Sequence, residues 1–313
     1  MPVKLLIDCD PGVDDAVALL LAAGHPDAEV LAITTVAGNQ TLEKVTLNAR
    51  RIATIAGLDG VPVAAGADRP LVRDQIMAAE VHGETGLDGP AYFEPTVPLA
   101  DTNGVDLIID TVMSRPGEVT LVPIGPLTNI AAALRREPRL VEAVAGVVIM
   151  GGSYTRGNTT AAAEFNILAD PEAAAIVFSA RWPLTMVGLD LTHQARATDA
   201  VIDRIMALDT APGRFVVDLL RAAQKRMVAL GWGSELALHD ACAVAYAIDP
   251  TLMTGQTAHV VVELKGEHTY GMTVTDFRGR SGAANTNVPQ ELDADRFWSM
   301  LVHSLERVPD YAG

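Results

Sequence analysis

The chain has 313 residues, of which 49% are hydrophobic and 20% are charged, and its formal net charge at pH 7 is −16. This composition is typical of a globular protein and excludes a disordered chain. The negative charge, with no clustered run of lysine and arginine, argues against a nucleic-acid partner, because binding to a phosphate backbone depends on clustered basic side chains.

The two cysteines, Cys9 and Cys242, are too few for a disulfide framework, so we expect a reducing, cytoplasmic environment. The first apolar run stops at Asp8, which leaves no room for the apolar region of a signal peptide. The longest uninterrupted apolar run is far below the roughly 18 residues that would cross a membrane. The sequence therefore predicts a soluble protein without a membrane partner.

Strand-like and helix-like patterns alternate through the first two thirds of the chain. The apolar run Leu5–Ile7 predicts a first strand, Pro11-Gly12 turns the chain, and Ala16–Ala23 predicts a buried helix. Further strands are predicted at Glu29–Val36, Val61–Ala64, Val119–Ile124, Gly146–Met150 and Leu184–Leu189, and further helices at about Thr41–Ala56, at about Gly104–Ser114, after Gly125-Pro126 and after Asp170. This alternation predicts an α/β fold, with a mostly parallel, open, Rossmann-like central sheet flanked by helices.

The last third of the chain is predicted to be mainly helical. Helices are expected at Asp199–Leu208, Gly213–Leu230, about Leu238–Ile248 and about Asp293–Leu305, with strands at Ala258–Leu264 and Tyr270–Thr275. Two long irregular stretches, Gly66–Asp101 and Ser153–Ala163, interrupt the pattern, and loops of this length are usually functional or disordered. No repeat or linker divides the chain, so we expect a single domain over residues 1–313.

The junction of the first strand and helix carries four carboxylates within eight residues, Asp8, Asp10, Asp14 and Asp15. Strand alternation places Asp8 and Asp10 on one side and Cys9 on the other, in the core. Two like charges about 4 Å apart repel by roughly 4 kcal/mol at an effective dielectric constant of about 20. A helix N-terminus stabilises a carboxylate by only about 0.3–1 kcal/mol. If the acids converge, a cation or raised pKa values must offset the repulsion; the alternative is one helix cap and three solvated acids.

Other polar residues recur near the ends of the predicted strands, in the long loops, or at the start of a helix. They are Asn39, His82, Asn158, Glu164, Asn166, His239 and Asp240. Ligands of open parallel sheets bind at the carboxyl ends of the strands, so we expect these side chains around one site. Carboxylate and amide oxygens without a zinc-type Cys–His cluster favour Ca²⁺ or Mg²⁺ and a ligand with several hydroxyls, such as a sugar. Singly, each residue also has an ordinary explanation as a turn, cap or loop residue.

The stretch Asp8–Ala16 resembles the signature of the inosine-uridine preferring nucleoside hydrolase family. The rest of the family's pattern follows in order at Gly38-Asn39, His82-Gly83, Gly125–Ala131, Met150–Gly152, Glu164–Asn166 and Leu238–Asp240. The resemblance covers nearly the whole chain. It implies a Ca²⁺-dependent enzyme of nucleoside salvage that cleaves the N-glycosidic bond of ribonucleosides, giving ribose and free base. It also implies a homo-oligomer, a dimer or a tetramer, built from one catalytic domain.

Carried over residue by residue, the resemblance implies three groups of site residues. Metal ligands would be Asp10, Asp15, Asp240 and the backbone carbonyl of Ile124; ribose would be held by Asp14, Asn39, Asn158, Glu164, Asn166 and Asp240; the base would lie near His82, Phe165 and His239. In the implied mechanism, Ca²⁺ orients a water molecule and two ribose hydroxyls, and Asp10 takes a proton from the water. The ribose passes through an oxocarbenium-like transition state, and His239 donates a proton to the departing base. Asp8 would support the site without binding the metal.

The base side departs from the family pattern. Relatives often have Tyr or Gln in the helix before the His-Asp pair, where this chain has Met227 and Ala229. Gln224 or Trp232 would be the substitutes, while the Met and Leu residues of Met227–Leu238 are predicted to pack against the protein rather than to contact substrate. The preference for purine or pyrimidine bases therefore stays open.

Two other functions are compatible with parts of this pattern. An apolar strand followed by Asp-x-Asp also begins haloacid-dehalogenase-type phosphatases that use Mg²⁺, but Asp14 and Asp15 add negative charge where phosphate would bind. The second alternative is a nucleoside- or sugar-binding protein that has lost catalysis, which the altered base side keeps open.

Overall fold

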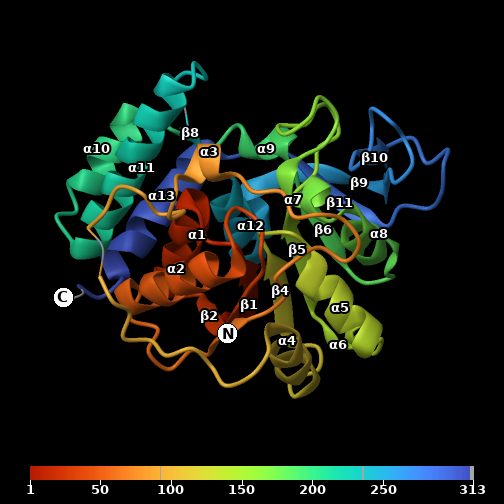
Figure 1. The fold of residues 1–313 in the computed structure, drawn as a ribbon, viewed down its shortest axis with the longest axis horizontal. Coiled ribbons are helices and arrows are strands. Elements are labelled where there is room, and N and C mark those ends of the chain that lie inside the picture. The colour runs from red at the N-terminus through yellow and green to blue at the C-terminus, as the bar shows by residue number, and fades with distance from the viewer. Residues whose placement is uncertain (92, 235, 311–313) are drawn as a thin grey trace.

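The computed structural model describes residues 1–91, 93–234 and 236–310. Its centre is a nine-stranded sheet covered by helices on both faces (Figure 1). In spatial order the strands are β10 (Thr273–Asp276), β9 (Met253–Val262), β11 (Thr286–Leu292), β6 (Leu184–Val187), β5 (Gly146–Met150), β4 (Val119–Pro123), β1 (Val3–Cys9), β2 (Ala28–Thr35) and β3 (Val63–Ala65). The strands from β11 to β3 pair in parallel, and β9 pairs antiparallel with β10 and β11. The predicted α/β fold class is confirmed.

Strand β1 explains why this sheet forms. Leu5, Leu6 and Ile7 have no exposed surface; Leu5 and Ile7 pack into the apolar cluster on one face, and Leu6 packs into the cluster on the other. A continuous apolar run is what a strand covered on both faces requires. Ile7 lies opposite Ile33 of β2 and Val122 of β4. This parallel register brings the carboxyl ends of the three strands to one edge of the sheet.

Helices cover the two faces in separate sets. The apolar cluster on the first face includes α1 (Val13–Gly24), α2 (Leu42–Ile55), α12 (His239–Ile248) and α13 (Ala294–Arg307), and the second face carries α4 (Gly104–Met113), α5 (Thr128–Arg136), α6 (Leu140–Ala143) and α8 (Pro171–Ser179). Helices α10 (Asp199–Met206) and α11 (Ala211–Ala229) extend the first cluster by packing on α13, and α11 also contacts α1. Helix α1 packs against both α12 and α13, near the end of the chain. The start of the chain and its last third therefore share one core.

Parts of the fold differ from the sequence prediction. The sequence predicts no strand at Thr286–Leu292, yet β11 lies inside the sheet between β6 and β9. Pro289 and the polar residues of this segment weaken its strand pattern. The segment is a strand because it pairs with β6 on one side and β9 on the other. Strand β9 begins at Met253, earlier than predicted, and the irregular stretch Gly66–Asp101 contains the short helix α3 (Ala79–His82).

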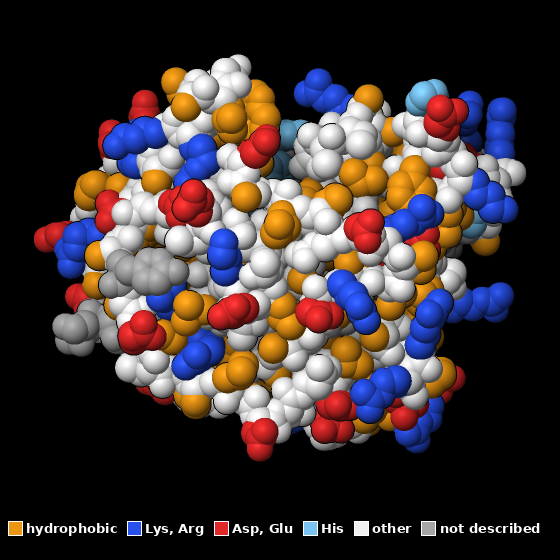
Figure 2. Space-filling model, in the orientation of Figure 1, with side chains coloured by type: hydrophobic (Ala, Val, Ile, Leu, Met, Phe, Trp, Pro, Cys, Tyr) orange, Lys and Arg blue, Asp and Glu red, His pale blue; other side chains and the backbone are white. Residues whose placement is uncertain are grey.

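The visible surface has no basic patch of the kind that binds nucleic acid (Figure 2). Figure 2 shows Lys, Arg, Asp and Glu side chains interspersed on one face, with no continuous basic stripe in view. A recess at the top of this view, beside α9 (Leu189–Thr192), has histidine side chains within it. Within residues 1–91, 93–234 and 236–310, no helix has both the length and the apolar character needed to cross a membrane.

Candidate active site

The turn between β1 and α1 is held together by Asp15. Its carboxylate accepts N–H groups from Asp10 (3.1 Å) and Gly12 (2.9 Å). Asp15 is the third residue of the helix, so its side chain satisfies the backbone N–H of the N-cap residue, Gly12. Asp15 has no exposed surface, and burial, followed by the charge of Asp14, raises its pKa to about 7. The turn thus folds a buried acid into the carboxyl edge of the sheet.

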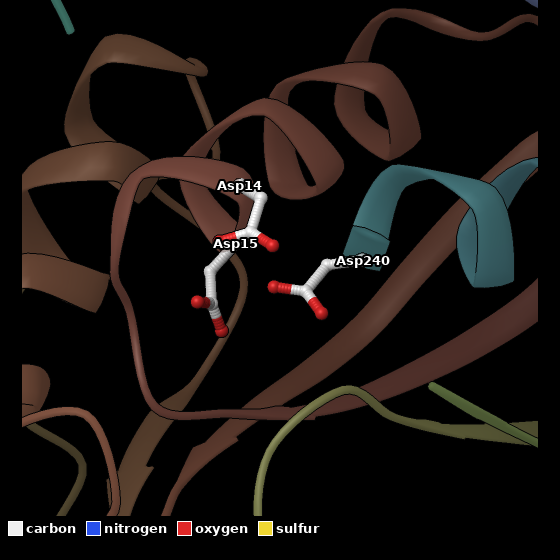
Figure 3. A group of neighbouring side chains, drawn as sticks. All are labelled: Asp14, Asp15 and Asp240. Atoms are coloured by element: carbon white, nitrogen blue, oxygen red, sulfur yellow. The ribbon is translucent and has the colours of Figure 1, made fainter. Parts of the chain in front are cut away.

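Three carboxylates converge at this edge. Figure 3 shows Asp14 and Asp15 at the start of α1 facing Asp240, which lies in the first turn of α12. One carboxylate oxygen from each residue lies within 4.8 Å of those of the other two. Burial, and next the charge of Asp14, raises the pKa of Asp240 well above its ordinary value. Of the alternative with one helix cap and three solvated acids, the cap is confirmed, because Asp15 accepts the N–H of Gly12. The rest is wrong for Asp8 and Asp10, which have no exposed surface.

Asp10 lies beside this group without belonging to it. Its Oδ2 accepts the N–H of Asn39 at 2.6 Å, whereas its buried Oδ1 has no hydrogen-bond partner within the described residues. Burial, followed by the charge of Asp15, raises the pKa of Asp10 well above its ordinary value. Gly38 and Gly125 make room for the carboxylate, since an added Cβ would lie 2.1 Å from Oδ2 and 2.6 Å from Oδ1, respectively. A buried oxygen without a partner, next to three other acids, fits a bound cation.

Asp8 lies deeper and connects three elements. Its Oδ1 accepts the hydroxyl of Thr34 in β2 at 2.6 Å and the side-chain amide of Asn129 in α5 at 2.8 Å. Burial raises the pKa of Asp8 to about 7. Cys9 points the other way, into the core, where its thiol donates to the carbonyl of Thr34.

A second group of polar side chains lies at the start of α7, next to the ends of β4 and β5. Glu164 caps α7 (Phe165–Ala169): its carboxylate accepts N–H groups from Asn166 (2.9 Å), Ile167 (3.2 Å) and Gly152 (2.9 Å). Burial nevertheless raises its pKa to about 7. The Asn166 amide donates to the carbonyl of Ile124 at 3.0 Å and to that of β5's last residue at 3.1 Å, which ties α7 to both strands.

A cavity of about 330 Å³ joins these groups. Of the predicted site residues, Asp14, Asn39, His82, Ile124, Asn158, Glu164, Phe165, Asn166, His239 and Asp240 line it. Asp10 and Asp15 do not line the cavity. The volume lies in the range of small-molecule pockets.

Apolar side chains and histidines also line the cavity. Met227, Trp232 and Leu236 are among the apolar ones. The prediction that the Met and Leu residues of this stretch pack against the protein is confirmed for Leu236 and Leu238 and is wrong for Leu230, which is exposed. Gln224 instead accepts a hydrogen bond from Arg221 and is not among the lining residues. Helical spacing identifies an apolar face but not whether protein or ligand covers it.

Three histidines line the cavity: His82, His193 and His239. Val13 donates its N–H to Nδ1 of His82 at 3.2 Å. The rings of His193 and His239 meet edge to face, with centroids 5.4 Å apart. Burial lowers the pKa of all three and brings that of His239 to about 4. His193 lies in the turn after α9 and is not among the predicted site residues, because a lone histidine carries no distinguishing signal in a sequence.

An acid-rich pocket at the carboxyl edge of an open parallel sheet is typical of an α/β enzyme that binds a small polar ligand. The sequence model of the family described as "Inosine-uridine preferring nucleoside hydrolase" matches residues 5–299, and the chain belongs to this family. It is therefore a hydrolase that acts on N-glycosyl compounds. This membership argues against the phosphatase alternative.

Individual relatives match over nearly their whole length. The inosine-uridine preferring nucleoside hydrolase of Crithidia fasciculata is 52% identical, with 99% of each chain covered. A pyrimidine-specific ribonucleoside hydrolase of Shewanella woodyi is 46% identical, with 96% of this chain and 97% of the relative covered. The solved structure of a purine-preferring ribonucleoside hydrolase from Gardnerella vaginalis has a TM-score of 0.91 at 33% identity, covering 97% of this chain and 98% of that one. The base preferences in the names of these three relatives differ from one another.

Gly38→Ala tests the close approach at Asp10. The new Cβ would lie 2.1 Å from Oδ2, so the carboxylate must move. We expect a loss of about 1–3 kcal/mol in the free energy of unfolding, as in other overpacked sites, and a fall of about 10- to 100-fold in kcat/KM for nucleoside hydrolysis. Denaturant unfolding and ribose release measure the two effects.

Gly60→Ala is the matched control, because a Cβ at Gly60 meets no atom within 4 Å. It should change stability by no more than about 0.5 kcal/mol and leave hydrolysis unchanged. Equal activity of the two variants would contradict the role given to Gly38.

Proposed function

We propose that the protein is a Ca²⁺-dependent ribonucleoside hydrolase that cleaves the N-glycosidic bond with water to give ribose and a free base. The observation that carries this proposal is a group of converging acids at a pocket whose lining combines carboxylate and amide groups with apolar side chains. The acids suit a hard cation, the carboxylate and amide groups suit ribose, and the apolar side chains suit a base.

The residues that would hold the cation are Asp10, Asp15, Asp240 and the carbonyl of Ile124. This set offers only oxygen, and the unpartnered Oδ1 of Asp10 fits a further ligand. When bound, Ca²⁺ would orient the attacking water and the ribose hydroxyls, lower the pKa of the water, and offset the charge of the acids. Asp14 lines the pocket and Asp15 does not, which supports assigning Asp14 to the ribose and Asp15 to the metal.

The ribose hydroxyls would lie among Asp14, Asn39, Asn158, Glu164, Asn166 and Asp240, all of which line the cavity. Asn39 and Asn166 are held by hydrogen bonds to the backbone at the strand ends, so their positions are set before a ligand binds. Such preorganisation reduces the entropy lost on binding.

In the reaction, Asp10 would take a proton from the water that attacks the anomeric carbon. The bond to the base breaks as the ribose gains oxocarbenium character, and the surrounding carboxylates stabilise this positive charge. His239 would donate a hydrogen bond to the departing base, with His82 and Phe165 beside it. The hydroxyl from water completes the ribose, the departing base takes one proton from solvent, and Asp10 then releases the proton of the water to solvent.

A ribose-release assay with inosine, adenosine, guanosine, uridine and cytidine in the presence of Ca²⁺ tests the proposal and ranks the bases. Release of ribose from at least one nucleoside is the expected result. Binding of these nucleosides without ribose release would instead identify a binding protein that has lost catalysis.

We further propose that residues 1–313 form one catalytic domain, with residues 92, 235 and 311–313 outside the described part. The shared core of α1, α12 and α13 supports it. A cytoplasmic location and a dimeric or tetrameric state are also proposals; they rest on the two buried free cysteines and on the family resemblance, respectively.

The raised pKa values predict how stability depends on pH. Asp15 and Glu164 titrate at about 7 in the folded protein, against ordinary values of 3.8 and 4.5. Between these values the folded protein holds protons that the unfolded chain has released, so stability falls as pH rises through this window. Below about pH 6.5 the lowered pKa values of four histidines (His25, His82, His193 and His239) oppose this trend. We therefore expect the Tm of chelator-treated protein to decrease from about pH 6.5 to pH 8, and added Ca²⁺ to raise Tm more at higher pH, because it binds the deprotonated acids. Thermal unfolding at several pH values measures both; a metal-free Tm that rises over this window would contradict the expectation.

A further inference from the structure

The ring of His239 is hydrogen-bonded to a hydroxyl of α9. Oγ1 of Thr192, the last residue of α9, is 2.6 Å from Nδ1 of His239. Thr192 has no exposed surface. Within the part of the chain that the structure describes, Nδ1 of His239 is the hydroxyl's one hydrogen-bond partner. The ring itself lines the cavity.

Satisfying this buried hydroxyl decides the direction of the hydrogen bond. A neutral imidazole carries one N–H and offers its other nitrogen as an acceptor. If Nδ1 donated to Thr192, the hydroxyl proton would be buried without an acceptor, which native structures avoid. Thr192 therefore donates to Nδ1, and the proton of the ring lies on Nε2.

Backbone contacts fix the position of Thr192 relative to His239. The strands β7 (Arg196–Ala197) and β8 (Leu236–Ala237), which follow α9 and precede α12, pair with each other. The N–H of Leu238 then donates to the carbonyl of Ala195 at 3.0 Å. These contacts hold the end of α9 and the start of α12 in one register.

The same helix is tied to a loop at the mouth of the pocket. Asp190 of α9 accepts the N–H of Tyr154 at 2.7 Å and the hydroxyl of Thr155. His193, next to Thr192 in sequence, packs edge to face against the His239 ring. The ring of His239 is thus oriented by its hydrogen bond to Thr192 and by its contact with His193.

We propose that Thr192 is a positioning residue that fixes His239 as the Nε2–H tautomer, so that the ring directs a hydrogen-bond donor at the departing base. This inference rests on the proposed nucleoside hydrolysis. The base leaves with its bonding electrons, and the donor stabilises the charge that develops on it. Without the hydroxyl, the ring is free to rotate or to carry its proton on Nδ1.

Thr192→Val removes the hydroxyl and keeps the shape of the side chain. The test compares inosine and uridine with 4-nitrophenyl β-D-ribofuranoside, whose leaving group departs without a donor. We expect Thr192→Val to lower kcat about 10- to 100-fold on the two nucleosides and to change kcat on the nitrophenyl riboside by less than about threefold. Thr192→Ser retains the hydroxyl and should restore nucleoside hydrolysis, with KM unchanged.

Each other outcome has a defined meaning. An equal loss on all three substrates, or no loss on the nucleosides, overturns the role of Thr192. Wild-type protein that cleaves none of the three contradicts the proposed function itself. If Thr192→Val does not fold, ¹⁵N NMR of the wild-type protein at neutral pH determines which ring nitrogen of His239 carries the proton. The His239→Gln variant assigns the signals. A proton on Nε2 supports the inference, and a proton on Nδ1 overturns it.

Discussion

Asp10→Asn should lower kcat for nucleoside hydrolysis by at least about 10³-fold at saturating Ca²⁺. The amide retains an oxygen that can accept the N–H of Asn39, the bond now made at 2.6 Å, so the turn should keep its geometry. What it loses is the negative charge and the ability to take a proton from water. Ribose release measures the loss, and circular dichroism together with Tm checks the fold.

Asp8→Asn is the matched control, with the same chemical change two residues earlier. The oxygen of the new amide can still accept from Thr34 and Asn129, so both hydrogen bonds of Asp8 can be retained. We expect kcat to stay within about threefold of wild type, since no contact with substrate is lost. Substantial activity in Asp10→Asn would reject the proton-acceptor role, and equal losses in both variants would point to a structural effect alone.

Removal of the metal should abolish hydrolysis reversibly. Without a cation, the acids Asp10, Asp15 and Asp240 have pKa values raised mainly by burial, with neighbouring carboxylates adding to the shift of each. The N–H groups that Asp10 and Asp15 accept offset only part of the charge in the deprotonated state. We expect the activity of chelator-treated, dialysed protein to fall to background and to return when Ca²⁺ is added. The assay is ribose release, with metal content measured by mass spectrometry on the same samples.

Mg²⁺ addition is the control for metal identity. Ca²⁺ takes six to eight oxygen ligands at flexible geometry, whereas Mg²⁺ requires a near-ideal octahedron and loses water reluctantly. A site that also binds ribose hydroxyls therefore favours Ca²⁺, and Mg²⁺ should restore less activity. Full activity in metal-free samples would show that hydrolysis needs no metal. Full restoration by Mg²⁺ but not by Ca²⁺ would identify the metal as Mg²⁺ instead of Ca²⁺.

Much of the fold could be predicted because its signals are local. The run Leu5–Ile7 is apolar at every position, which a strand buried on both faces requires, and the alternation of strands and helices follows from the period of the pattern. Strand β11 could not be predicted in this way. Its residues pair with β6 and β9, and those partners, rather than its own composition, make it a strand.

For the site, the sequence by itself determined which chemical groups are available and that four acids crowd the turn after β1. Only the tertiary structure decided which of them meet: Asp240 comes from the far end of the chain, and the packing of α12 on α1 brings it to Asp14 and Asp15. Tertiary packing also turned Met227 toward the pocket and placed Thr192 behind His239. The physical reason is that a residue pattern records the chemical character of a face, while the element that covers the face is selected by packing across the whole chain.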